Sequence, residues 1–182
     1  LMRVQHPNVA RRPASETQPM AERRISDEAL LWITLIASVV ATLWPLPDLL
    51  RLIWPYWTAM VMVYWVLEGN RLRSLGQAFL LGLLLDVLTG SLLGQHALSL
   101  VVMSFLLERF RNQLRFFPPW QQAVAVMALL LNDRLIQLAV AVVRNEPWPP
   151  ALWWLAPLVG MVLWPWLFLA MDALRRRRRL SP

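Results

Sequence analysis

Apolar residues along this chain come in long blocks, and short polar segments rich in arginine separate them. A soluble helix keeps one polar face along its length, and most of these blocks have none. Such blocks are typical of helices that cross a bilayer, where about 20 apolar residues span the hydrocarbon. We therefore expect an all-α, polytopic membrane helix bundle with six transmembrane helices, at residues 29–44, 52–67, 75–93, 97–107, 120–143 and 151–174.

The second and fourth blocks are shorter than an untilted crossing requires. We expect Pro55 to open the second helix at its first turn, where the missing N–H costs nothing, and the fourth helix to start within residues 94–96. Four crossings are the alternative, if this pair is re-entrant. The last block contains Pro157 and Pro165, each of which favours a bend.

The arginines indicate how the helices are oriented, because positive residues concentrate in short cytoplasmic loops. With six crossings, one side of the membrane receives nearly all the arginines and the other receives only Arg51 and Arg144. Both termini are then cytoplasmic, and the number of crossings is even. Tryptophans at the block ends support this assignment as an aromatic belt, and those at the expected outer interface are Trp44, Trp54, Trp57, Trp148, Trp153 and Trp154.

Composition adds limits to this picture. The chain is 58% hydrophobic, carries a net charge of +7 and has no cysteine, which excludes disulfides and a thiol nucleophile. The positive charge lies beside the apolar blocks, so we expect it to face membrane lipid and no nucleic acid. The expected organisation is a disordered cytoplasmic segment at 1–26, in which Met20 is an alternative start, a six-helix transmembrane domain at 27–175 and a basic cytoplasmic tail at 176–182.

Small residues and one acid recur every fourth position in the third block, at Gly82, Asp86, Gly90 and Gly94. This spacing places them on one face of a helix, and small residues there allow another backbone to approach closely. The approaching helix could belong to this chain or to another protein. Gly90 and Gly94 could instead form the turn at the outer end of the helix.

Asp86 requires a partner, because a charge inside the bilayer costs about 2.5 to 3.5 kcal/mol on insertion scales. The fifth block contains Asn132, Asp133 and Arg134. Asp86 follows Arg73 by thirteen residues and Asp133 follows Trp120 by thirteen, so both lie about 20 Å from the cytoplasmic edge. We therefore expect an intramembrane polar cluster of Asp86 with one or more of these three residues. It would serve as structural glue or, alternatively, as a proton or ligand site.

No catalytic or cofactor motif accompanies this cluster. The sequence has no metal-binding HExxH pair, no phosphate-binding loop and no dinucleotide fingerprint, so we expect no enzyme activity, no cofactor and no metal. His96 stands alone at a helix start and is expected to be a surface or hydrogen-bonding residue. The terminal basic run is expected to anchor the last helix to anionic lipid, or alternatively to an acidic partner, through Arg175, Arg176, Arg177, Arg178 and Arg179.

Five segments taken in order resemble the rod shape-determining protein MreD family: WPLPDLLRLIWPYW at 44–57, VYWVLEGNR at 63–71, LLGLLLDVLTGSLLGQHAL at 80–98, WQQA at 120–123 and LWPWLFLAMD at 163–172. The Leu-Asp-x-x-x-Gly-Ser-x-x-Gly core at 85–94 is the most specific of them. The resemblance implies a multi-pass protein of the bacterial inner membrane and a bundle similar to the substrate-binding subunits of energy-coupling-factor transporters.

The same resemblance implies a non-catalytic scaffold of the cell-elongation complex, which builds the lateral peptidoglycan wall. MreC would bind directly, and PBP2, RodA and MreB would belong to the same complex. The face formed by Gly82, Asp86, Gly90 and Gly94 is then the expected binding surface for the MreC transmembrane helix. The alternative is a small-molecule or lipid-binding carrier subunit with a polar pocket around Asp86 and Asp133.

Overall fold

The computed structural model describes residues 18–68 and 75–180 of the chain. The described residues contain helices and no strand, which confirms the all-α prediction over this part of the chain. The elements in order are α1 (Gln18–Thr42), α2 (Asp48–Ile53), α3 (Trp57–Leu67), α4 (Leu75–Thr89), α5 (Gln95–Leu114), α6 (Pro119–Val143), the 3₁₀ helix η2 (Ala151–Leu155) and α7 (Ala156–Leu180).

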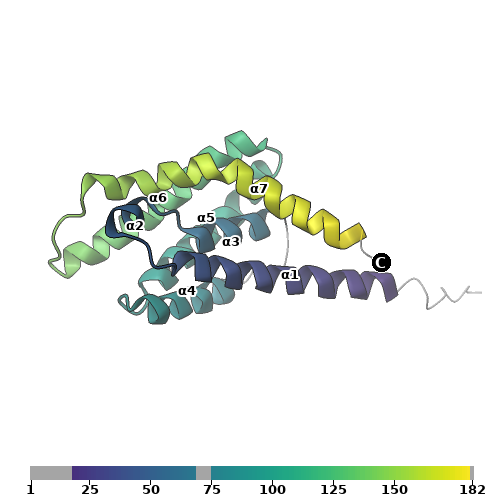
Figure 1. Ribbon diagram of the computed structural model, residues 1–182, viewed down its shortest axis with the longest axis horizontal. Coiled ribbons are helices and arrows are strands. Elements are labelled where there is room, and N and C mark those ends of the chain that lie inside the picture. The colour runs from purple at the N-terminus through teal and green to yellow at the C-terminus, as the bar shows by residue number, and fades with distance from the viewer. Residues whose placement is uncertain (1–17, 69–74, 181–182) are drawn as a thin grey trace, which may run out of the picture.

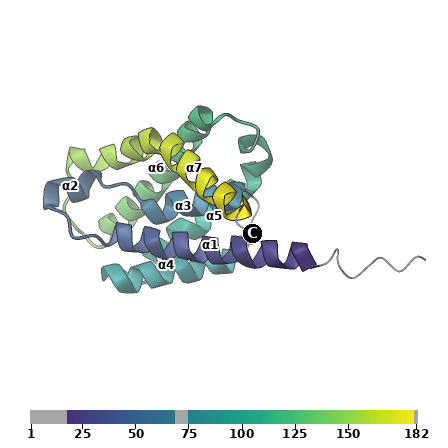
Figure 2. The ribbon, with the colours of Figure 1, turned by 45° about the vertical axis from the view of Figure 1, so that its right-hand side comes forward.

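Helix α3 forms the centre of the bundle. Every residue from Thr58 to Leu67 is buried, and the helix packs against α1, α5 and α7. A helix that is apolar on all sides has no face that prefers water, so it can lie at the centre of a bundle. Its Trp65 indole donates a hydrogen bond to Thr34 Oγ1 of α1 at 2.9 Å. Figures 1 and 2 show α4 along one side of this core and α6 with α7 along the opposite side.

Among the described residues, three segments are long and apolar enough to cross a membrane: Leu50–Leu67, Pro119–Val143 and Ala151–Arg177. Two shorter apolar helices cover Glu28–Thr42 and Leu75–Thr89. Large apolar side chains also remain on the outside of the bundle, for example Leu80 of α4 and Trp166 of α7. These features are those of a membrane helix bundle. That the chain crosses the membrane six times stays a prediction.

The second predicted helix is interrupted, which corrects the expectation that it begins at residue 52. Helix α2 ends at Ile53, and α3 starts only at Trp57. Trp54 has an extended backbone with φ −65° and ψ 127°, since the residue before a proline avoids the helical conformation. Pro55 therefore separates two helices and does not open one.

The next two helices also differ in length from the prediction. Helix α4 ends at Thr89 and not at residue 93, because the next residue, Gly90, has a positive φ of 66°. Helix α5 continues to Leu114, beyond the predicted end at residue 107. The apolar block ends there, but the residues that follow include Glu, Arg and Gln, which are good helix formers.

The ends of the chain show two further differences. Residues 18–26, predicted to be disordered, form the first turns of α1, where Met20, Ala21 and Glu22 favour a helix. Residues 1–17 of that predicted segment, and residues 181–182 of the tail, lie outside the described residues. Pro157 lies in the first turn of α7, where it costs no hydrogen bond, so only Pro165 lies inside that helix.

The start of α1 and the end of α7 lie at the same end of the bundle (Figure 1). At this end Arg175 of α7 forms an ion pair with Glu68, which follows α3 directly, and its guanidinium lies 6.0 Å from the Trp65 ring. Helices α2 and η2 contact each other at the opposite end. The candidate site lies at that opposite end.

Candidate functional site: a polar junction and a cavity at one end of the bundle

Asp86 is the centre of a dense hydrogen-bonding group between α4 and α5. Its side chain is buried, although it belongs to an apolar helix. The backbone N–H groups of Gly94 and His96 donate to its two oxygens at 2.7 and 2.8 Å. Ser91 Oγ donates at 2.8 Å, and His96 Nδ1 lies 2.8 Å from the same oxygen, Oδ1. The carboxylate thus has a donor for each oxygen from the chain directly after its own helix.

These contacts make Asp86 a cap for the first turn of α5. The first N–H groups of a helix have no partner inside the helix, and the helix dipole favours a negative charge at that end. Gly94, the residue just before α5, has no side chain to serve as a cap, and Asp86 supplies the acceptor from the neighbouring helix. The acid is therefore compensated within the fold.

The predicted partners of Asp86 do not contact it in this structure. Among the described residues, no hydrogen bond joins Asp86 to Asn132, Asp133 or Arg134. The prediction compared only the depths of these residues in the membrane. The turn between α4 and α5 instead brings hydrogen-bond donors close to Asp86. His96, expected to be a surface or hydrogen-bonding residue, does form hydrogen bonds, but the sequence did not identify it as the partner of Asp86. His96 follows Asp86 by ten residues and comes just after Gly94. This spacing was the available signal that a turn brings His96 back to Asp86.

Gly82 sets how closely α4 and α5 approach each other. A Cβ atom built on Gly82 would lie 2.8 Å from the His96 carbonyl carbon and closer still to the backbone of Ala97. The face that carries Gly82 and Asp86 is thus occupied by α5 of the same chain. Gly90 and Gly94 have positive φ angles and free space around them, so they form the turn and not the packing face.

Asp133 contacts α5 one turn further along. Ser99 Oγ of α5 donates to its Oδ1, and Gln137 Nε2 donates to its Oδ2 at 2.8 Å. Arg134 forms no ion pair with this acid, and its guanidinium lies 4.4 Å from the centre of the Trp153 ring. Asn132 Nδ2 is buried without a hydrogen-bond partner among the described residues. The two acids therefore hold the start of α5 from two sides, Asp86 from α4 and Asp133 from α6.

A cavity of about 530 Å³ lies beside this junction. It is bounded by residues of α2, α5 and α6, by the segments around Trp54 and Ser91, and by Trp153 of η2. The Tyr56 ring contacts the His96 ring edge to face, with centroids 5.8 Å apart, and both residues line the cavity. Its main polar lining residues are Arg51, Tyr56, His96, Asp133, Arg134 and Gln137.

Ser91, His96 and Asp86 contain the residue types of a catalytic triad, but their geometry does not fit one. A triad needs the serine on one ring nitrogen and the acid on the other, so that the ring can relay a proton. Here Ser91 Oγ, at 3.1 Å, and Asp86 Oδ1, at 2.8 Å, both approach Nδ1 of His96. Across residues 18–68 and 75–180 no group of three acidic or histidine side chains is placed to hold a metal. The arrangement fits a structural contact that holds the start of α5, beside a cavity that can bind a ligand.

Comparison with known proteins identifies the family. A family model described as rod shape-determining protein MreD matches residues 23–174, which is most of the chain. The chain belongs to the MreD family. The rod shape-determining protein MreD of Haemophilus influenzae is 32% identical to it over 158 residues, covering 83% of this chain and 96% of that relative. No solved structure matches the chain, so the likeness to energy-coupling-factor subunits stays a prediction.

Membership of the MreD family gives the chain a role in determining rod shape, and the apolar helices make it a membrane protein. The junction of Asp86 with α5 and the polar cavity both fall inside the matched region. The basic run at the end of α7 falls just beyond it. There Arg175 is engaged with Glu68, and Arg176 pairs with Asp172 at 2.7 Å. The side chains of Arg178 and Arg179 lie outside the described residues.

Proposed function

We propose that this protein is a non-catalytic scaffold of the bacterial inner membrane that binds MreC and supports lateral peptidoglycan synthesis by the rod complex. The observation that carries this proposal is the match to the MreD family over residues 23–174. MreB, PBP2 and RodA then belong to the same complex, and PBP2 and RodA are reached through MreC. A scaffold requires a packed bundle with a surface that can receive a partner helix, and the packing of α3 against α1, α5 and α7 supports this proposal.

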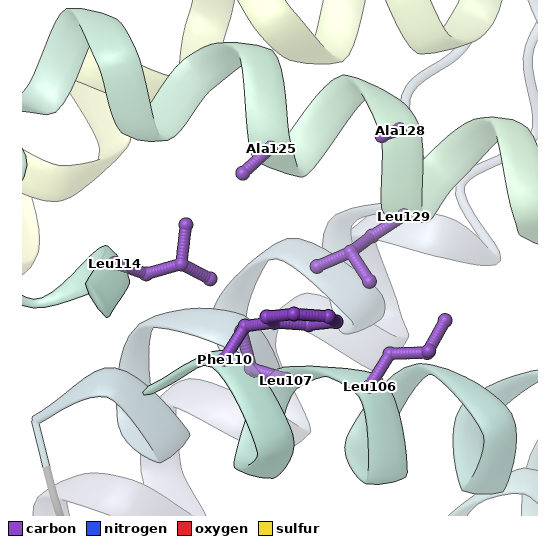
Figure 3. Close-up of a pocket in the computed structure, with 7 residues that line it drawn as sticks. All are labelled: Leu106, Leu107, Phe110, Leu114, Ala125, Ala128 and Leu129. Carbon is purple, nitrogen blue, oxygen red and sulfur yellow. The ribbon is translucent and has the colours of Figure 1, made fainter. Parts of the chain in front are cut away.

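The free surface differs from the one that the glycine pattern indicated. The face with Gly82 and Asp86 packs against α5, so it is not open to a second protein. An apolar groove of about 220 Å³ lies instead between α5 and α6. In Figure 3, Leu106, Phe110 and Leu114 face Ala125, Ala128 and Leu129 across this groove.

We place the MreC transmembrane helix in the groove between α5 and α6. Ala125 and Ala128 leave space because their side chains end at Cβ, and small residues allow membrane helices to pack closely. The groove has an almost entirely apolar lining, as expected for a contact made by side-chain packing inside the bilayer. The large residues on its rim, such as Phe110, would fix the register of the incoming helix.

Filling the groove is expected to weaken MreC binding. We predict that Ala128→Phe lowers the amount of MreC that co-purifies with the tagged protein about tenfold, because overpacking an interface typically costs about 1 to 3 kcal/mol. Co-purification from membranes, quantified by immunoblot, measures this. Cells that carry only the variant should also lose their rod shape.

The matched control is Val124→Phe, which adds a similar ring on an exposed position of α6 outside the groove. This variant should bind MreC as well as the unchanged protein. If wild-type protein fails to bring down MreC, the scaffold proposal itself is wrong. If wild-type protein binds MreC and both phenylalanine variants do so equally, MreC binds elsewhere on the bundle.

A further inference from the structure

The polar cavity at the α2 end of the bundle is lined by two arginine side chains that no described ion pair neutralises. Two guanidinium groups line it, from Arg51 of α2 and Arg134 of α6. Neither of them forms an ion pair with a described residue. Arg134 has a long hydrogen bond of 3.4 Å to Gln137 Oε1, its contact with the Trp153 ring, and an attraction to Asp133 that is not an ion pair. Arg134 is half-buried and no described ion pair neutralises it, so a bound anion would lower the cost of holding its charge inside the bundle.

The acids near the cavity are already satisfied. Asp133 is the carboxylate among the described lining residues, and both its oxygens accept hydrogen bonds, from Ser99 and from Gln137. Asp86 lies behind His96 and accepts from the start of α5. Tyr56 also lines the cavity, and its hydroxyl is buried without a partner among the described residues. The donors available in the cavity therefore include two cations and a neutral O–H.

We propose that this cavity binds a phosphate group, with Arg51 and Arg134 as its charged contacts and the Tyr56 hydroxyl as a neutral donor. Guanidinium groups match the oxygen geometry of phosphate and bind it through paired hydrogen bonds. Two cations from different helices, together with a neutral donor, suit an anion with several oxygens around one centre. The cavity of about 530 Å³ is larger than a bare phosphate, so a phosphate ester fits in it.

The position of the cavity points to two sources of phosphate. Trp54 and Trp153 are among its lining residues, and tryptophan concentrates at the level of lipid headgroups. A phospholipid headgroup could therefore enter from the bilayer, and a soluble phosphate compound could enter from the aqueous side. Both would use the same arginines. Binding does not require transport and does not depend on the MreC groove, which lies between other parts of α5 and α6.

The test is calorimetric titration of the purified full chain in a neutral detergent. The probes are dihexanoylphosphatidylglycerol, inorganic phosphate and dihexanoylglycerol, which has the same chains without phosphate. We expect saturable binding of at least one of the two phosphate probes and none of dihexanoylglycerol. Arg134→Gln and Arg51→Gln should each weaken that binding about tenfold or more, because each removes a charge-assisted contact.

The matched control is Arg144→Gln, because Arg144 follows the cavity end of α6 but pairs with Glu146 at 2.9 Å and does not line the cavity. Its affinity should equal that of the unchanged chain. Binding of phosphatidylglycerol alone identifies a lipid headgroup, and binding of inorganic phosphate identifies a soluble source. The proposal is overturned if neither phosphate probe binds, if dihexanoylglycerol binds equally well, or if all three variants bind alike. Arg51 is exposed on α2, so its variant should keep the fold even if Arg134→Gln lowers stability.

Discussion

Replacing Asp86 by alanine is expected to lower the free energy of unfolding by about 3 to 5 kcal/mol, because the change leaves several half-buried donors without an acceptor. The N–H groups of Gly94 and His96 and the hydroxyl of Ser91 all lose the same carboxylate. Unfolding of the purified protein by denaturing detergent, followed by tryptophan fluorescence, measures this. Amide hydrogen exchange at Gly94 and His96 should become faster in the same variant, since these two N–H groups lose their only acceptor.

Asp172→Ala is the matched control for Asp86→Ala. Asp172 is also a carboxylate on an apolar helix, but its partner Arg176 is one turn away on the same helix and largely exposed to solvent. Exposed ion pairs of this kind contribute about 0 to 1 kcal/mol. Both variants therefore remove a carboxylate, but the expected losses in the free energy of unfolding are very different. Equal stability of the two would show that the carboxylate of Asp86 does not hold the start of α5.

The sequence was sufficient to predict an all-α fold and the approximate position of most helices, together with the unusual status of Asp86. Long apolar blocks specify membrane helices because lipid leaves the backbone no other partner, and a buried acid always needs compensation. The same reasoning correctly marked small residues as points of close approach, as Gly82 shows. These conclusions depend on properties of single segments, which a sequence displays directly.

The partners of these residues could not be predicted in the same way. Depth along a helix was used to match Asp86 with Asn132, Asp133 and Arg134, although depth says nothing about which helix faces which. The turn at Gly90 and Gly94 decides this, because it folds α5 directly back onto α4. A polar pocket near Asp133 was an alternative prediction, but its arginine lining could not be predicted, since Arg51, Tyr56 and Trp153 come together only when α2 and η2 pack against each other.

Replacing Gly82 by alanine is expected to lower the free energy of unfolding by about 3 kcal/mol or more, because the new methyl group would overlap backbone atoms of His96 and Ala97. Backbone of a helix cannot move aside as a side chain can, so α4 and α5 must separate. Asp86 lies one turn further along the same face and would lose its short bonds to α5 as well. Denaturing-detergent titration measures the loss, and the double variant Gly82→Ala with Asp86→Ala should cost less than the sum of the two single changes.

Gly160→Ala provides the matched control on α7. A Cβ atom there would meet Cδ1 of Leu130, which is the end of a rotatable side chain, and alanine favours a helix over glycine by about 0.5 to 1 kcal/mol. The net change in stability should therefore stay below about 1 kcal/mol. Equal losses for the two alanine variants would mean that α4 and α5 can separate freely. If Gly82→Ala lowers stability and Gly160→Ala does not, a loss of MreC binding in Gly82→Ala reflects a disturbed bundle. The partner surface is then tested only by comparing Ala128→Phe with Val124→Phe.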